Sequence, residues 1–410
     1  MAVACQPVDM YLTRLSLTNF RNFSRLDVAV PRGPLLLVGA NAQGKTSLLE
    51  AVYYLATFTS LHASNDRQLI NLIAGREALA VGRIVAEYQR AGKSHQLEVR
   101  LIQEQAGNGT PRLRKEILLD GAKRKVNEVI GHLKAVLFLP QMLSVIEGSP
   151  DERRRYLDLA LAQSIPDYAA ALSYYNRSIS QRNALLKLLA ERGGDPEQLA
   201  YWDEQVSRTG SLLIQARIQA VQEIERLAAV IHHELTRGQE VFRLVYQPAY
   251  DPIPSKPGQF ELPLDTPVDR SNFKRTDIEA GFRQALAVRR AEEISRGVTT
   301  IGPHRDELRF LANGIDLGLY GSRGQVRTTM LAVKMAEVAW MQAKTGHWPL
   351  LLLDEVLAEL DPHRRQDLLA RLAHSEQALL TTTDLDLFET DFVKQATIWT
   401  VEQGRLKMDR

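Results

Sequence analysis

The chain has 410 residues, of which 45% are hydrophobic and 24% are charged, and its formal net charge at pH 7 is +2. This length and composition predict a globular protein with a large core and two or more lobes, and the small charge excludes an argument for nucleic-acid binding from the total alone. The single cysteine, Cys5, excludes an intrachain disulfide framework and favours the cytoplasm, and no apolar run reaches the ~18 residues of a membrane span.

Residues 1–9 are predicted to be a disordered extension or a start-site artefact, because patterned sequence begins only at Met10. Apolar and polar residues then alternate over residues 11–30, first around Leu15 and again around Val28. This alternation predicts two antiparallel strands that flank residues 19–23.

A phosphate-binding loop comes next. The apolar residues 35–38 predict a short buried strand, Gly39–Thr46 fits the pattern GxxxxGK[ST], and residues 48–55 predict a helix. The two glycines let backbone N–H groups point at phosphate oxygens. Lys45 supplies a charge for the β- and γ-phosphates of ATP, and the Thr46 hydroxyl suits Mg²⁺. A surface turn rich in glycine and lysine is the alternative, which the flanking strand and helix disfavour. The predicted cofactor-binding residues are Gly39, Ala40, Asn41, Ala42, Gln43, Gly44, Lys45, Thr46 and Ser47.

Residues 78–130 are rich in strand patterns, with a hairpin turn predicted at Asp120–Gly121. A solvated edge strand and a surface that contacts nucleic-acid phosphates both explain the basic residues gathered there. These residues are Arg112, Arg114, Lys115, Lys123, Arg124 and Lys125. A short strand over 136–139 ends at Pro140. Gln141, which follows, is a candidate contact for metal and water, and a plain surface loop explains it equally well.

Residues 149–240 are predicted to form a helical arm lobe, with a return segment to about residue 300. Long helical patterns run to about residue 192 and again from 195 to about 237, and Gly193–Gly194 separates them. The pair therefore predicts an antiparallel hairpin of helices of roughly 40 residues each. A projecting lobe and a part of a helical bundle both fit this pattern. A strand (241–247), a proline-rich loop (248–268) and a helix (277–295) follow, and Asn313–Gly314 predicts a further hairpin turn.

Ser322-Arg323-Gly324-Gln325 precedes a helical pattern and forms a second potential anion site. A hydroxyl, bare backbone and the positive end of a helix dipole would all point outward there. One nucleotide does not need two such sites from one chain. We therefore expect Ser322, Gly324 and Gln325 to cap the γ-phosphate held by another copy, in an ATP-dependent homodimer with two-fold symmetry. Taken alone, the same residues are explained by an ordinary helix cap.

Four leucines, 350–353, run into two carboxylates, Asp354 and Glu355. A continuous apolar run predicts a buried parallel strand, and side chains at its carboxyl end face the nucleotide. Asp354 suits a role at Mg²⁺, and Glu355 suits general-base activation of water. The end of a core strand is the simpler reading of the same pattern. Asp361 follows in a turn, as a contact to a partner's site or as a helix cap. Residues 379–383 predict the last core strand, where a residue that senses the γ-phosphate would lie.

The order of these motifs resembles the ATP-binding-cassette head domains of the SMC class. A closer match is carried by Asn19-Phe20-Arg21-Asn22, Pro150 with Arg153-Arg154, Gln181-Arg182-Asn183, Gly302-Pro303-His304-Arg305-Asp306 and the Ser322 segment, which together resemble the RecF family of recombination mediators. The resemblance implies an α/β fold, an ABC/SMC-type P-loop ATPase head with mixed β-sheets. The head would combine residues 10–148 and 301–410, with the helical arm lobe inserted between them.

The resemblance also implies a function. It implies ATP-dependent dimerisation on DNA, weak DNA-dependent ATP hydrolysis, and loading of RecA with RecO and RecR at gaps or junctions of single- and double-stranded DNA. Lys45, Asp354 and Glu355 would be catalytic. Thr46, Asp354 and Gln141 would contact the metal, while Arg21 and Asn22 would approach the nucleotide.

Three departures from the family pattern stand out. His62 occupies a position where the family usually shows arginine, the last predicted strand carries threonines, and residues 1–9 have no counterpart. His304 and Arg305 belong to a family motif but suggest no chemical role beyond packing of the arm.

Two other functions stay open. The nucleotide subunit of a membrane transporter would share the phosphate loop, but Ser322 lies too far from it in the sequence. An adaptor that binds ATP without hydrolysing it would have no evident need of Glu355.

Overall fold

The structure is a computed structural model that describes residues 10–60, 63–104, 112–253, 268–372 and 375–408. By its internal contacts the chain divides into two compact units. Unit 1 combines Met1–Met142 with Glu337–Arg410, and unit 2 is the intervening segment Leu143–Ala336. The predicted extension 1–9, His62 and most of the predicted loop 248–268 lie outside the described residues.

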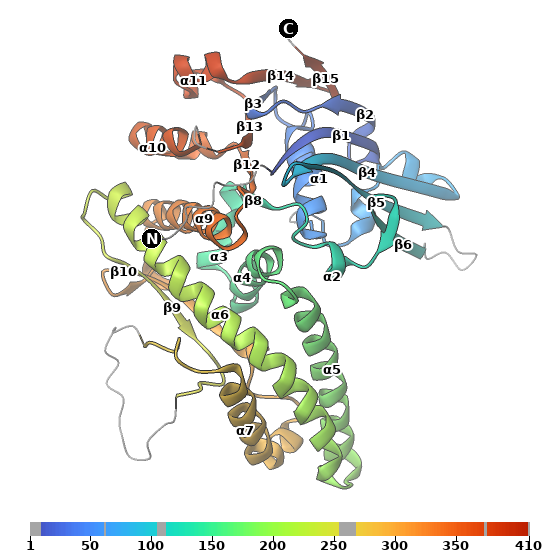
Figure 1. Ribbon diagram of the computed structural model, residues 1–410, viewed down its shortest axis with the longest axis vertical. Helices are drawn as coiled ribbons and strands as arrows, with labels where there is room; N and C mark the ends of the chain where they lie inside the picture. The colour runs from blue at the N-terminus through green and yellow to red at the C-terminus, as the bar shows by residue number, and fades with distance from the viewer. Residues whose placement is uncertain (1–9, 61–62, 105–111, 254–267, 373–374, 409–410) are drawn as a thin grey trace. The chain divides into compact units, whose positions relative to one another are not determined.

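Unit 1 contains an antiparallel six-stranded sheet in the order β2-β1-β4-β5-β6-β7 (Figure 1). The predicted pair of N-terminal strands is confirmed, because Thr18 pairs with Arg25 and Arg14 with Ala29. The hairpin turn at Asp120–Gly121 is confirmed as well, since both residues have positive φ (50° and 79°) and join β6 to β7. The strands are β1 (Met10–Phe20), β2 (Phe23–Ala29), β4 (Leu79–Arg90), β5 (Lys93–Glu104), β6 (Arg112–Leu119) and β7 (Ala122–Arg124).

The second sheet of unit 1 is mixed and runs in the order β15-β14-β3-β13-β12-β8. Its middle strands are parallel and nearly continuous in apolar residues, as expected for strands covered on both faces, and Leu350–Leu353 are each at most 3% exposed. The prediction that β13 is the last core strand is wrong, because β14 comes later in the sequence and pairs with β3. The strands are β3 (Gly33–Val38), β8 (Ala135–Phe138), β12 (Leu350–Asp354), β13 (Gln377–Thr382), β14 (Thr397–Glu402) and β15 (Arg405–Met408).

Helix α1 (Lys45–Thr57) contacts both sheets of unit 1, through β8 and β12 on one side and β4 and β5 on the other. Every residue from Leu48 to Thr57 is buried. A helix that is apolar on all sides belongs in a core, so the site at its N-terminus stands on a rigid base. The other helices of this unit are α2 (Val126–Val129), α10 (Pro362–Leu372) and α11 (Thr390–Gln395).

Unit 2 contains the predicted helical hairpin, because α5 and α6 pack against each other and α7 packs on both (Figure 1). The prediction of one helix of roughly 40 residues before Gly193 is wrong. The chain breaks after α4, since Pro166 has no N–H to donate and Asp167 has φ 62°. The helices are α3 (Ser144–Glu147), α4 (Pro150–Ser164), α5 (Tyr168–Arg192), α6 (Leu199–Leu235), α7 (Arg275–Arg296) and α8 (Leu317–Tyr320).

A three-stranded antiparallel sheet, in the order β11-β10-β9, also belongs to unit 2. It comprises β9 (Phe242–Gln247), β10 (Glu307–Ala312) and β11 (Ile315–Asp316), with the predicted turn at Asn313–Gly314 confirmed. We had predicted that residues 301–336 belong to the ATPase head. They group with unit 2 instead, because β10 pairs along its length with β9. Helix α9 (Arg323–Thr345) begins in unit 2 and ends in unit 1.

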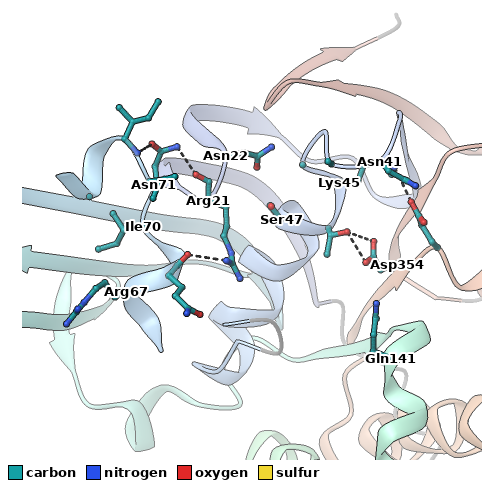
Figure 2. A pocket seen from close by; sticks show the side chains of 18 of the residues that line it. Arg21, Asn22, Asn41, Lys45, Ser47, Arg67, Ile70, Asn71, Gln141 and Asp354 are labelled. Atoms are coloured by element: carbon teal, nitrogen blue, oxygen red, sulfur yellow. Dashed lines mark hydrogen bonds and ion pairs between the residues drawn. The ribbon is translucent and has the colours of Figure 1, made fainter. Parts of the chain in front are cut away.

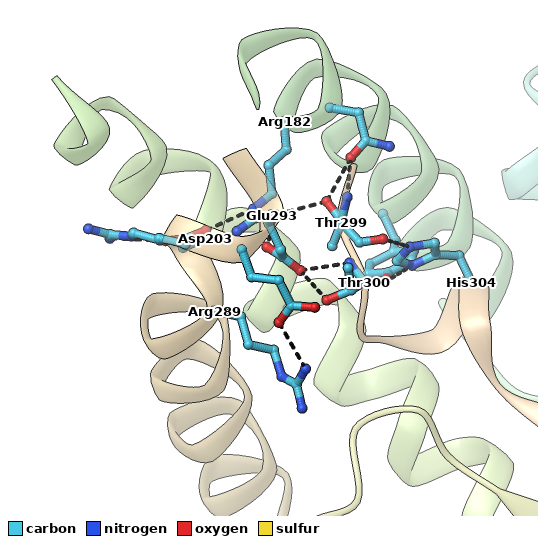
Figure 3. A network of polar contacts seen from close by, with 11 residues as sticks. Arg182, Asp203, Arg289, Glu293, Thr299, Thr300 and His304 are labelled. Carbon is cyan, nitrogen blue, oxygen red and sulfur yellow. Dashed lines mark hydrogen bonds and ion pairs between the residues drawn. The ribbon is translucent and has the colours of Figure 1, made fainter. Parts of the chain in front are cut away.

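Buried ion pairs connect three helices of unit 2, α5, α6 and α7 (Figure 3). The Arg182 guanidinium on α5 donates to Asp203 on α6 at 2.8 Å and to Glu293 on α7 at 2.6 Å, and none of the three is more than 1% exposed. Asn183 Oδ1 accepts from the backbone N–H of Thr299 at 2.8 Å. The family motif at 181–183 is therefore a structural link. Among the described residues, no helix is both long and apolar enough to cross a bilayer.

Candidate functional site

The phosphate loop follows β3 at the centre of the mixed sheet and leads directly into α1. Gly44 has φ 115°, and a Cβ there would lie 2.4 Å from Asn22 Nδ2. A Cβ on Gly39 would lie 2.4 Å from the carbonyl oxygen of Val401. Both positions therefore require glycine. Gly44 needs it for its positive φ, and at both positions a Cβ would come too close to a neighbouring atom. Ala42 also has positive φ (64°), so the loop is a tight backbone curl before the helix N-terminus.

The loop is held in place from both ends of the chain. The Gln43 carbonyl oxygen accepts from Asn22 Nδ2 at 2.9 Å and from the Gly404 N–H at 3.0 Å. Its side-chain Oε1 accepts from the Gln403 N–H at 2.7 Å. Gln43, predicted to bind the cofactor, thus has its side chain engaged in positioning the loop against the β14–β15 turn. The sequence pattern carried no signal for this contact.

Four predicted site residues come together at the carboxyl ends of the strands. Lys45, 4% exposed, donates to the carbonyl oxygens of Gly39 and Ala40 at 2.6 and 3.0 Å and lies 3.1 Å from Glu355 Oε1. Thr46 Oγ1 lies 2.9 Å from both carboxylate oxygens of Asp354, across 308 residues of sequence. The buried ammonium is thereby aimed into the loop, where a phosphate would replace the carbonyls as its partner.

Thr381 on β13 orients both acids. Its hydroxyl donates to Asp354 Oδ1 at 2.7 Å and accepts from the Glu355 N–H at 3.0 Å. Glu355 itself has φ 52°, in the left-handed region that non-glycine residues rarely adopt. The chain therefore turns sharply at Glu355, and Thr381 fixes that turn from the neighbouring parallel strand.

The oxygen ligands of this site fit Mg²⁺ bound to a nucleotide. No group of three His, Cys, Asp or Glu side chains in the described part of the chain could hold a metal alone. Mg²⁺, however, is usually bound by one or two protein oxygens together with substrate phosphates and waters. The Thr46 hydroxyl and the Asp354 carboxylate, already side by side, provide such a pair.

A cavity of about 1260 Å³ opens beside the loop (Figure 2). Gln141, exposed on the turn after β8, lines it together with Asp354, so the structure brings this predicted metal contact to the site. Asn41, Ala42, Gly44, Lys45, Thr46, Ser47 and Glu355 also line it, whereas Gly39, Ala40 and Gln43 do not.

Arg21 and Asn22 line the cavity as well, but Arg21 has a partner that the sequence did not suggest. Its guanidinium donates twice to the buried Glu50 of α1, at 2.7 and 2.8 Å, and once to the Gln68 carbonyl oxygen at 3.1 Å. Glu50 also accepts from Ser60 Oγ at 2.5 Å. Arg21 therefore builds the cavity wall, and its contact to a nucleotide stays a prediction.

The cavity continues along residues 67–76, which the sequence analysis did not single out. Arg67, Ile70, Asn71, Leu72, Ile73 and Arg76 line this part. The Asn71 side chain donates to the Arg21 carbonyl oxygen at 2.7 Å and accepts from the Ile73 N–H at 3.0 Å. Residues 67–76 carry no recognisable motif. Their place in the cavity lining could therefore be found only from the folded structure, in which they lie beside the end of β1.

The Ser322 segment lies in unit 2 and caps α9. The Ser322 N–H donates to Gln325 Oε1 at 3.0 Å, and the Gln325 N–H donates back to Ser322 Oγ at 3.3 Å, which is a reciprocal capping box. Gly324 is different. Its φ is not positive, and a Cβ would come no closer than 4.0 Å to Ser322 Oγ. The fold of this chain therefore does not require glycine there.

Asp361 and the motif residues Arg153 and Arg154 have structural partners. Asp361 accepts from the N–H groups of His363 and Arg364 at 3.1 Å each, so it caps α10 as the simpler interpretation predicted. Arg153 donates to Glu307 at 2.6 Å, and Arg154 donates to the Asp306 carbonyl oxygen at 2.5 Å. These two arginines therefore bind within unit 2.

The comparisons with known proteins agree with this geometry. The family model described as "RecF/RecN/SMC N terminal domain" matches residues 11–407. A protein of Chloroflexus aurantiacus named "DNA replication and repair protein RecF" is 39% identical over 407 residues, covering 97% of this chain and 99% of the relative. A protein of Herpetosiphon aurantiacus with the same name is 38% identical, covering 96% and 99%.

Solved structures give the same result. "Structure of the recombination mediator protein RecF-ATP in RecFOR pathway" superposes with a TM-score of 0.82 at 26% identity over all of both chains. The corresponding RecF-ATPrS structure has a TM-score of 0.81 at 27% identity, covering 99% of this chain and all of that one. An Smc head domain from Pyrococcus furiosus, at 16% identity and a TM-score of 0.51 over 98% and 96%, shares the fold alone.

Proposed function

Since the chain belongs to the RecF/RecN/SMC N-terminal domain family, we propose that it is a DNA-binding ATPase of recombinational repair. The observation that carries the proposal is the convergence of Lys45, Thr46, Asp354 and Glu355 on one cavity. The first two come from the phosphate loop, and the last two from the end of β12 and the turn directly after it, 308 residues beyond Thr46 in the case of Asp354. That pairing is what ATP hydrolysis needs, and the relatives named above are repair proteins.

In the proposed reaction the protein mainly positions groups and places charge. The N–H groups of the loop and the Lys45 ammonium bind the β- and γ-phosphates, while Glu355 orients the attacking water and accepts its proton. Thr46, Asp354 and Gln141 would hold Mg²⁺, which neutralises charge on the phosphate oxygens when bound. Thr381 keeps both acids in register through its hydroxyl, so it is a positioning residue.

We further propose that the site is completed by a second copy of the chain. Ser322 and Gly324 are exposed at the N-terminus of α9, a helix of 23 residues whose dipole favours an anion there. The fold itself does not require glycine at position 324, because its φ is not positive and no atom crowds the position of a Cβ. Use at a partner's γ-phosphate explains why the chain carries it.

DNA and repair partners complete the proposal. The ATP-dependent homodimer would bind gapped DNA or single-strand/double-strand junctions in the cytoplasm, hydrolyse ATP weakly in response, and load RecA together with RecO and RecR. The relatives' names and the RecFOR pathway in the titles of the solved structures support this assignment.

Three substitutions test the proposal. Lys45→Ala should abolish ATP binding and dimerisation, because the buried charge is lost. Glu355→Gln should keep both but lower turnover by about 100-fold or more, since general-base catalysis contributes at least that much. Ser322→Arg should bind ATP yet stay monomeric, with Ser180→Arg on the exposed face of α5 as its control.

The measurements are fluorescent-nucleotide binding, sedimentation velocity with ATP, and phosphate release with and without gapped DNA. A wild-type chain that binds ATP without turnover would be a non-hydrolysing adaptor. Turnover that DNA does not change would favour the transporter type of subunit. Normal dimerisation of Ser322→Arg would contradict the composite site.

A further inference from the structure

Two pairs of neighbouring apolar side chains are unusually exposed. Leu72 and Ile73 are 74% and 77% exposed, and Leu319 and Tyr320 are 72% and 76% exposed. Among the large hydrophobic side chains of the described residues, only Val288, at 78%, is exposed more. Isolated exposed apolar residues need no explanation, but two pairs of sequence neighbours do, one at the edge of the cavity and one just before the Ser322 segment.

The pair in unit 1 is held rigidly at the edge of the cavity. Leu72 and Ile73 line it directly after Asn71. The Asn71 side chain accepts from the Ile73 N–H and donates to the Arg21 carbonyl oxygen, while the Gly75 carbonyl oxygen accepts from Gln103 Nε2 at 2.9 Å. The turn is fixed on both sides of the pair. The hydrogen bonds of this turn therefore hold Leu72 and Ile73 in an exposed position.

The pair in unit 2 stands directly before the Ser322 segment. Leu317 of α8 is buried at 2% exposure and anchors the short helix, and Asp316 caps it by accepting from the Gly318 N–H at 2.9 Å. The next two side chains, Leu319 and Tyr320, project from the surface. Tyr320 is two residues from Ser322, so its Cα lies within about 7 Å of the serine.

The cavity has room for both a nucleotide and an incoming side chain. Its volume of about 1260 Å³ exceeds the roughly 300–1,000 Å³ of ordinary ligand sites. In Figure 2, Asp354 and Gln141 lie at one side, and Ile70 and Arg67 lie at the other, beyond Asn22 and Arg21. Phosphates bound near Lys45 would leave the side of residues 70–73 open.

We propose that Leu319 and Tyr320 of one copy pack on Leu72 and Ile73 of the other, sealing the nucleotide between two chains. This inference rests on the composite site proposed above. A two-fold dimer makes the contact twice, so eight exposed apolar side chains become buried. Together they offer on the order of 1,000 Å², a large part of the ≈1,200–2,000 Å² of a stable interface. DNA or another protein on these pairs is the competing outcome.

Cysteine crosslinking tests the contact directly, because Cys5 is the only cysteine of the chain. In a Cys5→Ser background, Ile73→Cys and Tyr320→Cys are prepared as separate proteins and mixed with a short bismaleimide. We expect a covalent heterodimer with Mg²⁺ and ATPγS, and none with ADP or without nucleotide. Val288→Cys mixed with Ile73→Cys is the control and should not crosslink. Absence of the heterodimer in samples that sediment as dimers would overturn the contact.

Substitution gives the energetic test. Ile73→Ser or Tyr320→Ser should raise the dimer dissociation constant with ATPγS by about 10-fold or more, as for a truncated interface anchor. Binding of fluorescent ATP to the Tyr320→Ser monomer should change by less than about 2-fold, because Tyr320 does not line the cavity of its own chain. Val288→Ser should leave both values unchanged. If wild type dimerises and these variants dimerise equally well, only the contact fails. If wild type never dimerises with ATPγS, the composite site itself fails.

Discussion

His304 is a neutral imidazole in the interior of unit 2. Its Nδ1 lies 2.7 Å from the Tyr175 hydroxyl, and its Nε2 lies 3.3 Å from the Thr299 carbonyl oxygen (Figure 3). A carbonyl oxygen can only accept, so Nε2 carries the hydrogen and Nδ1 accepts from Tyr175. Burial lowers the pKa of His304 to about 4. His304 of the family motif therefore packs within unit 2. Packing of the base of the arm against the head stays a prediction.

This pKa makes the stability of the protein depend on pH. Between about pH 6.5 and 4 the unfolded chain binds a proton at His304 that the folded chain excludes, so the free energy of unfolding falls as the pH falls. His304→Gln should remove this component and flatten the dependence between pH 7.5 and 5. Urea denaturation at several pH values measures it, with His363→Gln at an exposed position as the control. Equal pH dependence of His304→Gln and wild type would contradict the assignment.

Residues of the phosphate site could be predicted from sequence where a motif ties residue type to chemistry. Lys45, Thr46 and Asp354 were found in this way, and the structure brings them together. The Arg21–Glu50 pair was not predicted, because Glu50 looks like any polar residue of α1 until the helix is placed between two sheets. Buried polar partners depend on three-dimensional neighbours, which spacing along a chain does not reveal.

At the scale of elements, the charges around Arg182 join three helices of unit 2. The guanidinium is 0% exposed and has carboxylate partners on α6 and α7, while Arg290 of α7 reaches Asp203 from the other side at 3.0 Å. Removing one member leaves the other charges buried and unpaired, which costs more than the pair contributes. The network therefore fixes the relative position of α5, α6 and α7.

Arg182→Met should lower the free energy of unfolding by about 3–5 kcal/mol, since Asp203 and Glu293 would lose their main partner in the core. Chemical denaturation followed by tryptophan fluorescence measures the change. Arg177→Met, at an exposed position of the same helix, should stay within about 0.5 kcal/mol of wild type. A loss below about 1 kcal/mol for Arg182→Met would show that the network adds little.

Elements whose apolar residues follow a clear run or alternation could be predicted from the sequence. Elements without such a pattern could not. The strand at 350–354 and the hairpin turns followed from pattern. Strands β14 and β15 were missed because their apolar residues form neither a continuous run nor a long alternation. Residues 301–336 were assigned to the wrong unit because pairing of β10 with β9 joins positions 60 residues apart, such as Glu307 and Gln247.

At the scale of the whole molecule, the basic residues singled out in the sequence differ in where they lie and in what they contact. Arg153 and Arg154 bind within unit 2. In unit 1, Lys115 pairs with Asp66 at 2.7 Å. Lys123, Arg124 and neighbouring Lys125 are exposed at or beside the edge strand β7, where Lys123 also pairs with Glu116 at 2.8 Å. We therefore favour this edge as the surface that contacts DNA.

Lys123→Glu with Arg124→Glu should weaken DNA binding and make the slope of log K against log salt shallower by about 0.9 per lost phosphate contact. Fluorescence anisotropy on gapped duplex between low and moderate salt measures both effects. Lys394→Glu with Lys407→Glu, at exposed positions of the same unit, is the matched control for net charge. An equal loss in both double variants would indicate a general charge effect and no path along β7.

The central place of β3 in the mixed sheet has a consequence for biosynthesis. Leu36 pairs with Leu380, and the phosphate loop is braced by Gln403 and Gly404, so the nucleotide site is assembled from segments about 360 residues apart in the sequence. At 5–20 residues per second, roughly 20 to 70 s separate their synthesis. A growing chain on the ribosome therefore carries the phosphate-loop sequence long before the residues that hold the loop in place have been made.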